Sequence, residues 1–330
     1  MSEGGGWSTI ESDEGVFTSL IENLGVKDVQ FEELISLDAD TIRSLSPVYG
    51  VIFLFKWIRE QQQPSATTAA PISSSSQQPP SGTYDTSPPP SLFFANQTIQ
   101  NACGTQAILS VILNHDDAAS ASSTNPSAAP AIAIGPELRA FKDFTTGFPP
   151  DLLGEALSNS EPIRTAHNAF ARSSPFVDEI VRPHQDEEGG DVYHFIAYTP
   201  VNGRLYELDG LQPHPISHGD CTPEEFPDKV IGVIQQRIAR YPEGETRFNL
   251  MAVCRDLRVR AREFGDAEAL ETEERKRRAW AWENTLRKSN FVGFIGEMMK
   301  GVAGMKEQEG KFDEWVEGAK KETQRKLLRR

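Results

Sequence analysis

The sequence predicts an α+β fold in which a central antiparallel sheet is flanked by helices, and three observations support this prediction. Residues 107–113 are apolar at every position except Ser110, which is typical of a helix inside a core. Residues 192–210 contain two β-prone runs on either side of Asn202-Gly203, the pattern of a two-residue hairpin. From about Arg255 the chain becomes charged and helix-prone, which predicts a helical extension after the main domain.

The first 60 residues are expected to form an acidic helical opening followed by a buried strand. The apolar run at Val51–Phe55 is too short to span a bilayer, so we interpret it as that strand and expect no membrane association. Residues 62–91 are rich in Pro, Ser, Gln and Thr and carry almost no charge. Such a tract cannot bury enough apolar surface to offset the entropy of ordering, so we predict a disordered loop insertion. Residues 115–135, rich in Ala, Ser, Asn and Pro, are predicted to be a second low-complexity insertion.

The predicted core helix begins near Cys103, at the end of a polar segment that starts at Gln97. At a helix start, unpaired backbone N–H groups and the positive end of the helix dipole favour a thiolate over a thiol. The side-chain amide of Gln97 could stabilise an oxyanion beside that sulfur. A free cysteine is more often an inert core residue, so this segment alone does not establish a catalytic site.

The predicted hairpin supplies the missing partners of Cys103. If Asn202-Gly203 forms the turn, Val201 pairs with Arg204, Tyr198 with Glu207, and Ile196 with Asp209. Residues two apart on a strand share a face, so His194 and Asp209 are diagonal neighbours about 7–8 Å apart at the backbone. Their side chains can therefore meet.

Together these residues are typical of a cysteine hydrolase. Cys103 is the predicted nucleophile, and His194 is the predicted general base and acid that takes the thiol proton and later protonates the leaving amine. Asp209 is expected to orient the His194 ring, and Gln97 to hold the oxyanion with the backbone N–H of Cys103. Taken singly, a core histidine and a turn aspartate are the more common interpretations; the combination favours catalysis.

The rest of the sequence excludes several other classes. The net charge of −15 argues against a direct nucleic-acid partner. Three cysteines at unrelated spacings form no disulfide framework, and Cys221 and Cys254 are interpreted as packing or incidental thiols. No metal-ligand spacing and no phosphate-binding loop is found, so we expect neither a metal nor a cofactor. An amphipathic helix over residues 224–241 and an apolar strand over 248–254 complete the main domain.

These motifs resemble the ubiquitin C-terminal hydrolase family of cysteine proteases, and most of all its long-tailed, proteasome-associated members. The resemblance rests on Gln-x5-Cys-Gly-Thr at 97–105, on His194 within Tyr-His-Phe, and on Leu-Tyr-Glu-Leu-Asp-Gly at 205–210. It extends over most of the chain, through residues 11–17, 50–57, 156–160, 167–172 and 243–252.

The resemblance implies a papain-like fold with a knotted chain path, made of a catalytic domain over residues 1–256 and a helical proteasome-docking domain over 257–330. It implies that the chain hydrolyses peptide or isopeptide bonds after the C-terminal glycine of ubiquitin through a Cys103 thioester. Ubiquitin and polyubiquitin conjugates are the implied substrates, trimmed or debranched at the proteasome in the cytoplasm and nucleus. The polar segment Ser173 to Asp191 matches the family's active-site crossover loop, and further substrate contacts are implied at Asp13, Gly15, Val16 and Phe17.

The C-terminal segment has Met and aromatic residues at helical spacing, which usually pack on a domain's own core but also suit a partner groove. The resemblance favours a partner, the proteasomal ubiquitin receptor, with contacts implied at Phe312, Trp315 and Val316. The stretch between Arg255 and Trp280 is shorter than the family's usual helical linker.

Two alternatives stay open at the level of sequence. One is a catalytically idle, ubiquitin-holding subunit of a larger assembly, although the joint presence of four catalytic positions counts against it. The other is a hydrolase for a ubiquitin-like modifier, whose tail channel would be similar.

Overall fold

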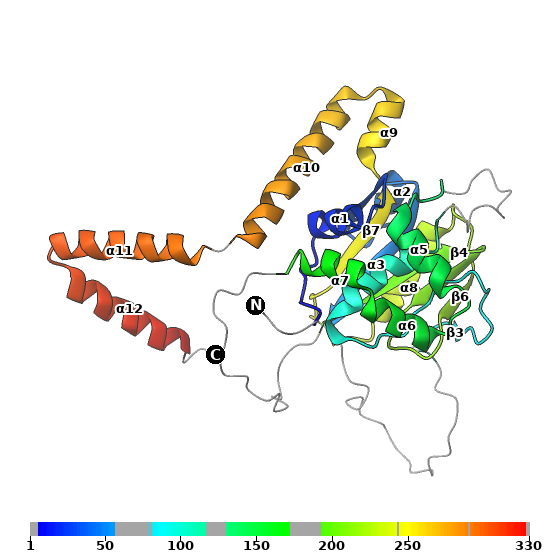
Figure 1. Ribbon diagram of the computed structural model, residues 1–330, viewed down its shortest axis with the longest axis horizontal. Coiled ribbons are helices and arrows are strands. Elements are labelled where there is room, and N and C mark those ends of the chain that lie inside the picture. The colour runs from blue at the N-terminus through cyan, green and yellow to red at the C-terminus, as the bar shows by residue number, and fades with distance from the viewer. Residues whose placement is uncertain are drawn as a thin grey trace, which may run out of the picture. The chain divides into compact units, whose positions relative to one another are not determined.

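A seven-stranded antiparallel sheet forms the centre of the main unit in the computed structural model, which describes residues 6–56, 79, 81–116, 130–171, 193–242, 244–289 and 291–327 (Figure 1). Its strand order is β1-β7-β2-β4-β5-β6-β3, and each neighbouring pair is antiparallel. The strands are β1 (Val29–Glu33), β2 (Val48–Lys56), β3 (Thr83–Tyr84), β4 (Tyr193–Val201), β5 (Arg204–Leu208), β6 (Ile216–Asp220) and β7 (Asn249–Arg255).

Helices cover both faces of this sheet, which confirms the predicted α+β class. One core lies under α1, α3, α5, α6 and α7, and the other under α2 and α8. Alternate residues of β2 face opposite cores: Ile52 packs in the first, and Val51 and Phe53 in the second. The helices around the sheet are α1 (Glu14–Asn23), α2 (Ala39–Ser44), α3 (Cys103–Ile112), α5 (Gly135–Thr145), α6 (Pro150–Asn159), α7 (Glu161–Asn168) and α8 (Phe226–Ile238).

The elements that position the candidate catalytic residues are those that the sequence predicted. The helix α3 starts at Cys103, and every later residue of it is buried, as expected for an apolar core helix. The β4–β5 hairpin has the predicted register, with Val201 opposite Arg204 and Tyr198 opposite Glu207. Asn202 and Gly203 both have positive φ angles, of 50° and 76°, which a tight hairpin turn between twisted strands requires.

The two predicted loop insertions are wrong where the structure describes them. In the first, Thr83–Tyr84 forms strand β3 on the sheet edge, and the Asp85 carboxylate accepts a 2.8 Å hydrogen bond from the Tyr206 hydroxyl. In the second, Asp116 is fully buried and forms ion pairs with Arg139 and Lys142. Long-range partners order these ends, and composition alone cannot reveal them. Residues 62–78, 80 and 117–129 lie outside the described part of the chain.

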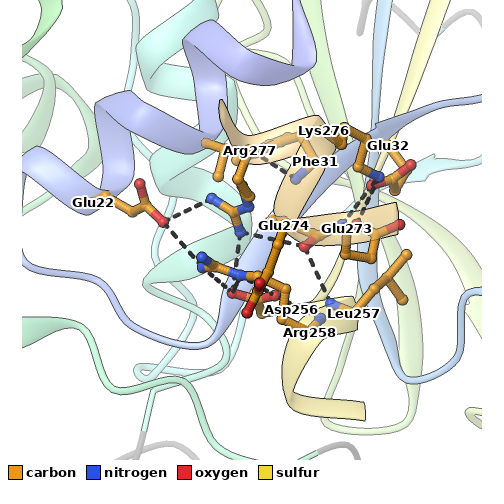
Figure 2. A network of polar contacts seen from close by, with 12 residues as sticks. Glu22, Phe31, Glu32, Asp256, Leu257, Arg258, Glu273, Glu274, Lys276 and Arg277 are labelled. Atoms are coloured by element: carbon orange, nitrogen blue, oxygen red, sulfur yellow. Dashed lines mark hydrogen bonds and ion pairs between the residues drawn. The ribbon is translucent and has the colours of Figure 1, made fainter. Parts of the chain in front are cut away.

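The division into units also differs from the predicted boundary at 256/257. The described residues up to Arg287 form one compact unit, which includes α9 (Leu257–Phe264) and α10 (Ala267–Lys288, except its last residue). The reason is visible in Figure 2, where Arg277 of α10 reaches Glu22 of α1 at 2.7 Å and Asp256 at 3.1 Å. The ring of Trp280 packs so closely on Gly15 that a side chain at that position would overlap it.

From Lys288 on, the chain forms part of a second unit, which contains the helices α11 (Val292–Gln308) and α12 (Phe312–Leu327). Both helices occur where the amphipathic spacing predicted them. No residue of α11 is buried, and none of residues 312–325 of α12 is buried either. More than half of the surface is exposed for the large apolar side chains of Phe294, Ile295, Met298, Met299 and Met305. Within the described residues, no helix has the length and apolar character needed to cross a membrane.

Candidate active site

The thiol of Cys103 opens into a cleft of about 680 Å³. Its walls come from segments far apart in the sequence, with Gln97 on the approach to α3 and His194 at the start of β4. Cys103 is partly exposed, whereas Cys221 and Cys254 are buried. Burial raises the pKa of the thiols of Cys221 and Cys254, which keeps them protonated and unreactive. Cys103 is therefore the cysteine available to a substrate.

The imidazole of His194 and the carboxylate of Asp209 form a direct pair. Nε2 of His194 lies 2.7 Å from Oδ1 of Asp209, and both side chains are buried. Asp209 follows β5 immediately, and its Oδ1 also accepts a 3.0 Å hydrogen bond from the backbone N–H of Leu211. The predicted pairing of His194 with Asp209 across the hairpin is confirmed. Because Asp209 holds Nε2, Nδ1 is the ring nitrogen left to interact with Cys103.

The electrostatics of the pair favour a charged imidazole. Burial of His194 disfavours its protonated form, but the hydrogen bond to Asp209 and the interaction with Cys103 outweigh burial and raise the pKa of His194 to about 9. Burial likewise opposes ionisation of Asp209, yet the hydrogen bond and charge of His194 hold the pKa of that carboxyl below its usual range. At neutral pH the site therefore holds an imidazolium between a carboxylate and a sulfur.

Gln97 lines the same cleft, and its backbone is held next to the histidine–aspartate pair. The Gln97 N–H donates a 2.8 Å hydrogen bond to the carbonyl of Gly210, the residue after Asp209. Gly210 has no room for a side chain, because a Cβ atom there would overlap the amide of Gln106 and come within 3.1 Å of the Gln97 Cβ. Close approach of two backbones thus places the candidate oxyanion donor beside the acid–base pair. The sequence pattern predicted the role of Asp209, but nothing in it indicated that Gly210 allows this close backbone approach.

One wall of the cleft was missed by sequence reasoning. Thr9, Ile10 and Ser12 line it, and no role in the cleft was predicted for any of them. Asn101, two residues before Cys103, donates a 2.9 Å hydrogen bond from Nδ2 to the carbonyl of Trp7. This contact joins the wall to the residues around the nucleophile.

A buried histidine holds the same wall from another side. Nε2 of His167 lies 2.6 Å from the carbonyl of Ser8, and its Nδ1 lies 2.7 Å from the hydroxyl of Thr105. Donation from Nε2 to the carbonyl leaves Nδ1 as the acceptor for Thr105, so the ring is neutral. Burial lowers the pKa of His167, which agrees with that assignment. His167 therefore links α7, the nucleophile helix and the N-terminal wall.

The substrate contacts implied at Gly15, Val16 and Phe17 are contradicted by the structure. Val16 and Phe17 are fully buried in the first core, and Gly15 lies under Trp280. All three are buried residues of α1. Asp13 instead accepts a hydrogen bond from the Val16 N–H as the cap of α1, and a substrate contact by Asp13 stays a prediction.

Two further sites were predicted, the crossover loop and the partner-binding residues. The crossover loop Ser173 to Asp191 lies outside the described residues. Phe312, Trp315 and Val316 are on α12 in the second unit, where the rings of Phe312 and Trp315 are 6.1 Å apart between centroids.

Comparison with known families gives two matches along the chain. The family described as ubiquitin carboxyl-terminal hydrolase, family 1, matches residues 7–239, a range that contains Cys103, His194 and Asp209. A second family, described as ubiquitin carboxyl-terminal hydrolases, matches residues 265–307, which cover α10 and most of α11.

The similarity to known proteins extends over almost the whole chain. Ubiquitin carboxyl-terminal hydrolase 2 of Schizosaccharomyces pombe is 48% identical over 300 residues, which are 89% of this chain and 90% of that protein. Ubiquitin carboxyl-terminal hydrolase ubh-4 of Caenorhabditis elegans is 34% identical over 338 residues, covering 97% of this chain and 93% of the relative. The crystal structure of Trichinella spiralis UCH37 bound to ubiquitin vinyl methyl ester is similar at 30% identity and a TM-score of 0.59, covering 86% of this chain and all of that chain.

Proposed function

Because this chain belongs to family 1 of the ubiquitin carboxyl-terminal hydrolases, we propose that Cys103 is the nucleophile with which it cleaves bonds after the C-terminal glycine of ubiquitin. The chain is a deubiquitinating cysteine protease. The observation that supports the assignment to Cys103 is local. A partly exposed cysteine at the start of α3 interacts with His194, whose other ring nitrogen is 2.7 Å from Asp209.

In the reactive form the proton is on the His194 imidazole, whose pKa is raised, and Cys103 is a thiolate. The sulfur attacks the carbonyl carbon of the terminal glycine, and His194 gives the proton to the leaving amine as the C–N bond breaks. A thioester between ubiquitin and Cys103 remains. Water activated by His194 hydrolyses this thioester and releases ubiquitin and the free thiol. Asp209 keeps Nε2 occupied throughout, so that Nδ1 faces the sulfur.

The developing negative charge on the carbonyl oxygen needs donors that are in place before the reaction. The backbone N–H of Cys103 belongs to the first turn of α3 and so has no partner within the helix. Gln97 is the proposed second donor, because its backbone is held at Gly210 beside the site. Each such donor contributes roughly 3–4 kcal/mol to the stabilisation of a tetrahedral intermediate.

Labelling with an electrophilic ubiquitin tests the assignment of the nucleophile. Ubiquitin vinyl methyl ester added to the full chain is expected to form one covalent adduct, located at Cys103 by peptide mass mapping. Cys221→Ser and Cys254→Ser are matched controls that should label at the wild-type rate, because both thiols are buried. An adduct on either control cysteine, or labelling of Cys103→Ala, would refute the assignment.

We further propose polyubiquitin conjugates, trimmed or debranched at the proteasome, as the physiological substrates. A narrow channel suits a Gly-Gly tail, since it excludes residues with larger side chains. Turnover of a ubiquitin C-terminal amide compared with the amide of a ubiquitin-like modifier separates this proposal from its closest alternative. Faster turnover of the modifier would favour that alternative, and no turnover of either would favour an idle ubiquitin-binding subunit.

The proposed partner of the C-terminal helices is the ubiquitin receptor of the proteasome, which would place the protein in the cytoplasm and nucleus. The support comes from exposed apolar side chains in α11 and α12, including Met298 and Phe312, which have no core of their own to pack into. Apolar helix faces of this kind suit a groove on a partner.

Truncation after Gly310 is expected to abolish co-purification with the proteasome, because it removes α12 entirely. A milder variant, Phe312→Ala with Trp315→Ala, is expected to weaken co-purification strongly, whereas Lys311→Ala at a neighbouring exposed position should not. Affinity purification from cells with quantification of proteasome subunits measures the effect. Full recovery of proteasome with the truncated chain would contradict the docking proposal.

A further inference from the structure

A buried charge cluster lies against Asp209 and takes no part in the bond-making steps or proton transfers of the reaction. At its centre is Arg237 of α8, which is 8% exposed. Its Nη1 forms an ion pair with Oε1 of Glu207, a residue of β5 that is 1% exposed, and its Nη2 lies 4.0 Å from Oδ2 of Asp209. One guanidinium therefore serves two buried carboxylates, one of which orients the catalytic histidine.

The position of the guanidinium is determined on more than one side. Its carbon lies 4.4 Å from the centre of the Phe55 ring, and that ring meets the His194 ring edge-on at 5.7 Å between centroids. Glu207 is itself held by His218, whose Nε2 is 3.1 Å from Oε2 of the carboxylate. The chain of contacts thus runs from His218 through Glu207 and Arg237 to Asp209.

We propose that Arg237 is a positioning residue for the hydrolysis: held by Glu207, it fixes the orientation and charge of the Asp209 carboxylate and so sets the pH range in which the site works. The proposal rests on the roles assigned above to Asp209 and His194. Oδ1 of Asp209 accepts from His194 and from Leu211, so Oδ2 is the atom on which Arg237 acts. A buried carboxylate with a cation on one oxygen stays ionised, and it rotates less freely.

Two independent features argue against a purely structural role. Burial of an ion pair contributes little net stability compared with apolar side chains of similar volume, so stability alone is a weak reason for this cluster. In addition, Arg237 lowers the pKa of Asp209, after the larger effects of burial, of His194 and of the Leu211 N–H. Other titratable or charged groups also face the cluster: His194 and Tyr198 on β4, His218 on β6, Cys103 on α3, and Arg240 and Tyr241 after α8.

Removing the two charges of the cluster separately should move the pH profile in opposite directions. Without the Arg237 cation, protons bind more tightly to Asp209 and His194, so both limbs of the profile of kcat/KM shift to higher pH in Arg237→Met. Without the Glu207 anion, protons bind less tightly, so both limbs shift to lower pH in Glu207→Gln. Each shift is expected to be about one pH unit. A structural defect would lower activity at every pH without moving the two limbs in opposite directions.

The experiment measures hydrolysis of a fluorogenic ubiquitin C-terminal amide by the full chain from pH 5 to 10. We expect kcat of Arg237→Met to fall about tenfold to 100-fold with little change in KM, because a misplaced His194 slows the chemical step. Arg237→Lys keeps the charge and should restore the position of the profile. Lys229→Met is the matched control, because this cation on the same helix pairs with the exposed Glu225 and lies outside the cluster.

Profiles of Arg237→Met and Glu207→Gln that superimpose on that of the wild type would overturn the proposal. Shifts of both in the same direction would do so as well. If Arg237→Met does not fold, the test rests on Glu207→Gln, whose side-chain amide oxygen can still accept a hydrogen bond from Arg237. A pH profile of Glu207→Gln that superimposes on that of the wild type is then sufficient to reject the proposal. Wild-type turnover that does not depend on Cys103 would instead refute the proposed function, so the two failures are distinguishable.

Discussion

Cys103→Ala is expected to abolish hydrolysis of ubiquitin C-terminal amides while leaving ubiquitin binding intact. The substitution removes one sulfur atom at the start of α3, where the thiol is partly exposed and contributes little to the core. Loss of the nucleophile of a catalytic unit typically lowers kcat by a factor on the order of 10⁴ to 10⁶. The binding surface is unchanged, so affinity for ubiquitin should be close to that of the wild type.

Stopped-flow fluorescence and calorimetry with the full chain measure the two halves of this prediction separately. Cys221→Ala, a buried cysteine outside the cleft, is the matched control and should retain turnover even if it loses some stability. Residual activity of Cys103→Ala within tenfold of the wild type would show that another group attacks the carbonyl, and the mechanism would then be wrong.

Asp209→Ala is expected to have the second largest effect, a loss of kcat of at least about 100-fold and up to about 10⁴-fold. Without the carboxylate, Nε2 of His194 loses its hydrogen-bond partner. The ring can then rotate and present the wrong tautomer to Cys103. Asp209→Asn separates orientation from charge, because an amide oxygen can still accept from Nε2. We therefore expect Asp209→Asn to lose less activity than Asp209→Ala. Equal turnover of Asp209→Ala and the wild type would exclude an orienting role.

Asp209→Asn is also expected to change how the free energy of unfolding depends on pH. The pKa of His194 is raised to about 9 in the folded protein, against about 6.5 in an unfolded chain. The native state therefore holds a proton that the unfolded state releases between these values, and the resulting stabilisation is complete below about pH 6.5 and is lost as pH rises through about 9. In Asp209→Asn this loss should largely disappear, because His194 has no carboxylate partner.

Denaturant unfolding at pH 6, 7.5 and 9 measures this difference. The free energy of unfolding of the wild type should fall by up to a few kcal/mol over the range, and that of Asp209→Asn by clearly less. Parallel curves for the two proteins would show that the His194–Asp209 interaction does not raise the pKa of the histidine.

Much of the candidate site could be predicted because it depends on local rules. The period-2 alternation of a strand, together with the Asn202-Gly203 turn, placed His194 and Asp209 on one face, and the register of the hairpin agrees. The apolar character of the segment after Cys103 predicted a buried helix, which α3 is. These features need only the residues of one element or of two consecutive ones.

The predictions of the loop insertions and of the domain boundary were wrong because contacts between residues far apart in the sequence determine the structure there. Tyr84 and Asp116 lie in tracts of low-complexity composition, yet a sheet edge orders the first and two basic side chains on α5 bind the second. The charged segment that forms α10 was predicted to belong to a separate helical domain, because the composition changes near Arg255 and the family resemblance implies such a domain. Two of its residues, Trp280 and Asn284, are buried, and they pack on α1 with charged side chains around them.

By itself, the sequence predicted the reaction class and the candidate catalytic residues, because a cysteine at a helix start and a His–Asp pair on a hairpin are defined by short-range geometry. The tertiary structure alone decided what surrounds them: the N-terminal wall of the cleft, the close backbone approach at Gly210, and the position of Arg237 against Asp209. Periodicity shows which side of an element is buried, but not which other element covers it. That choice is made by the packing of the whole core, where each contact joins residues far apart in the chain.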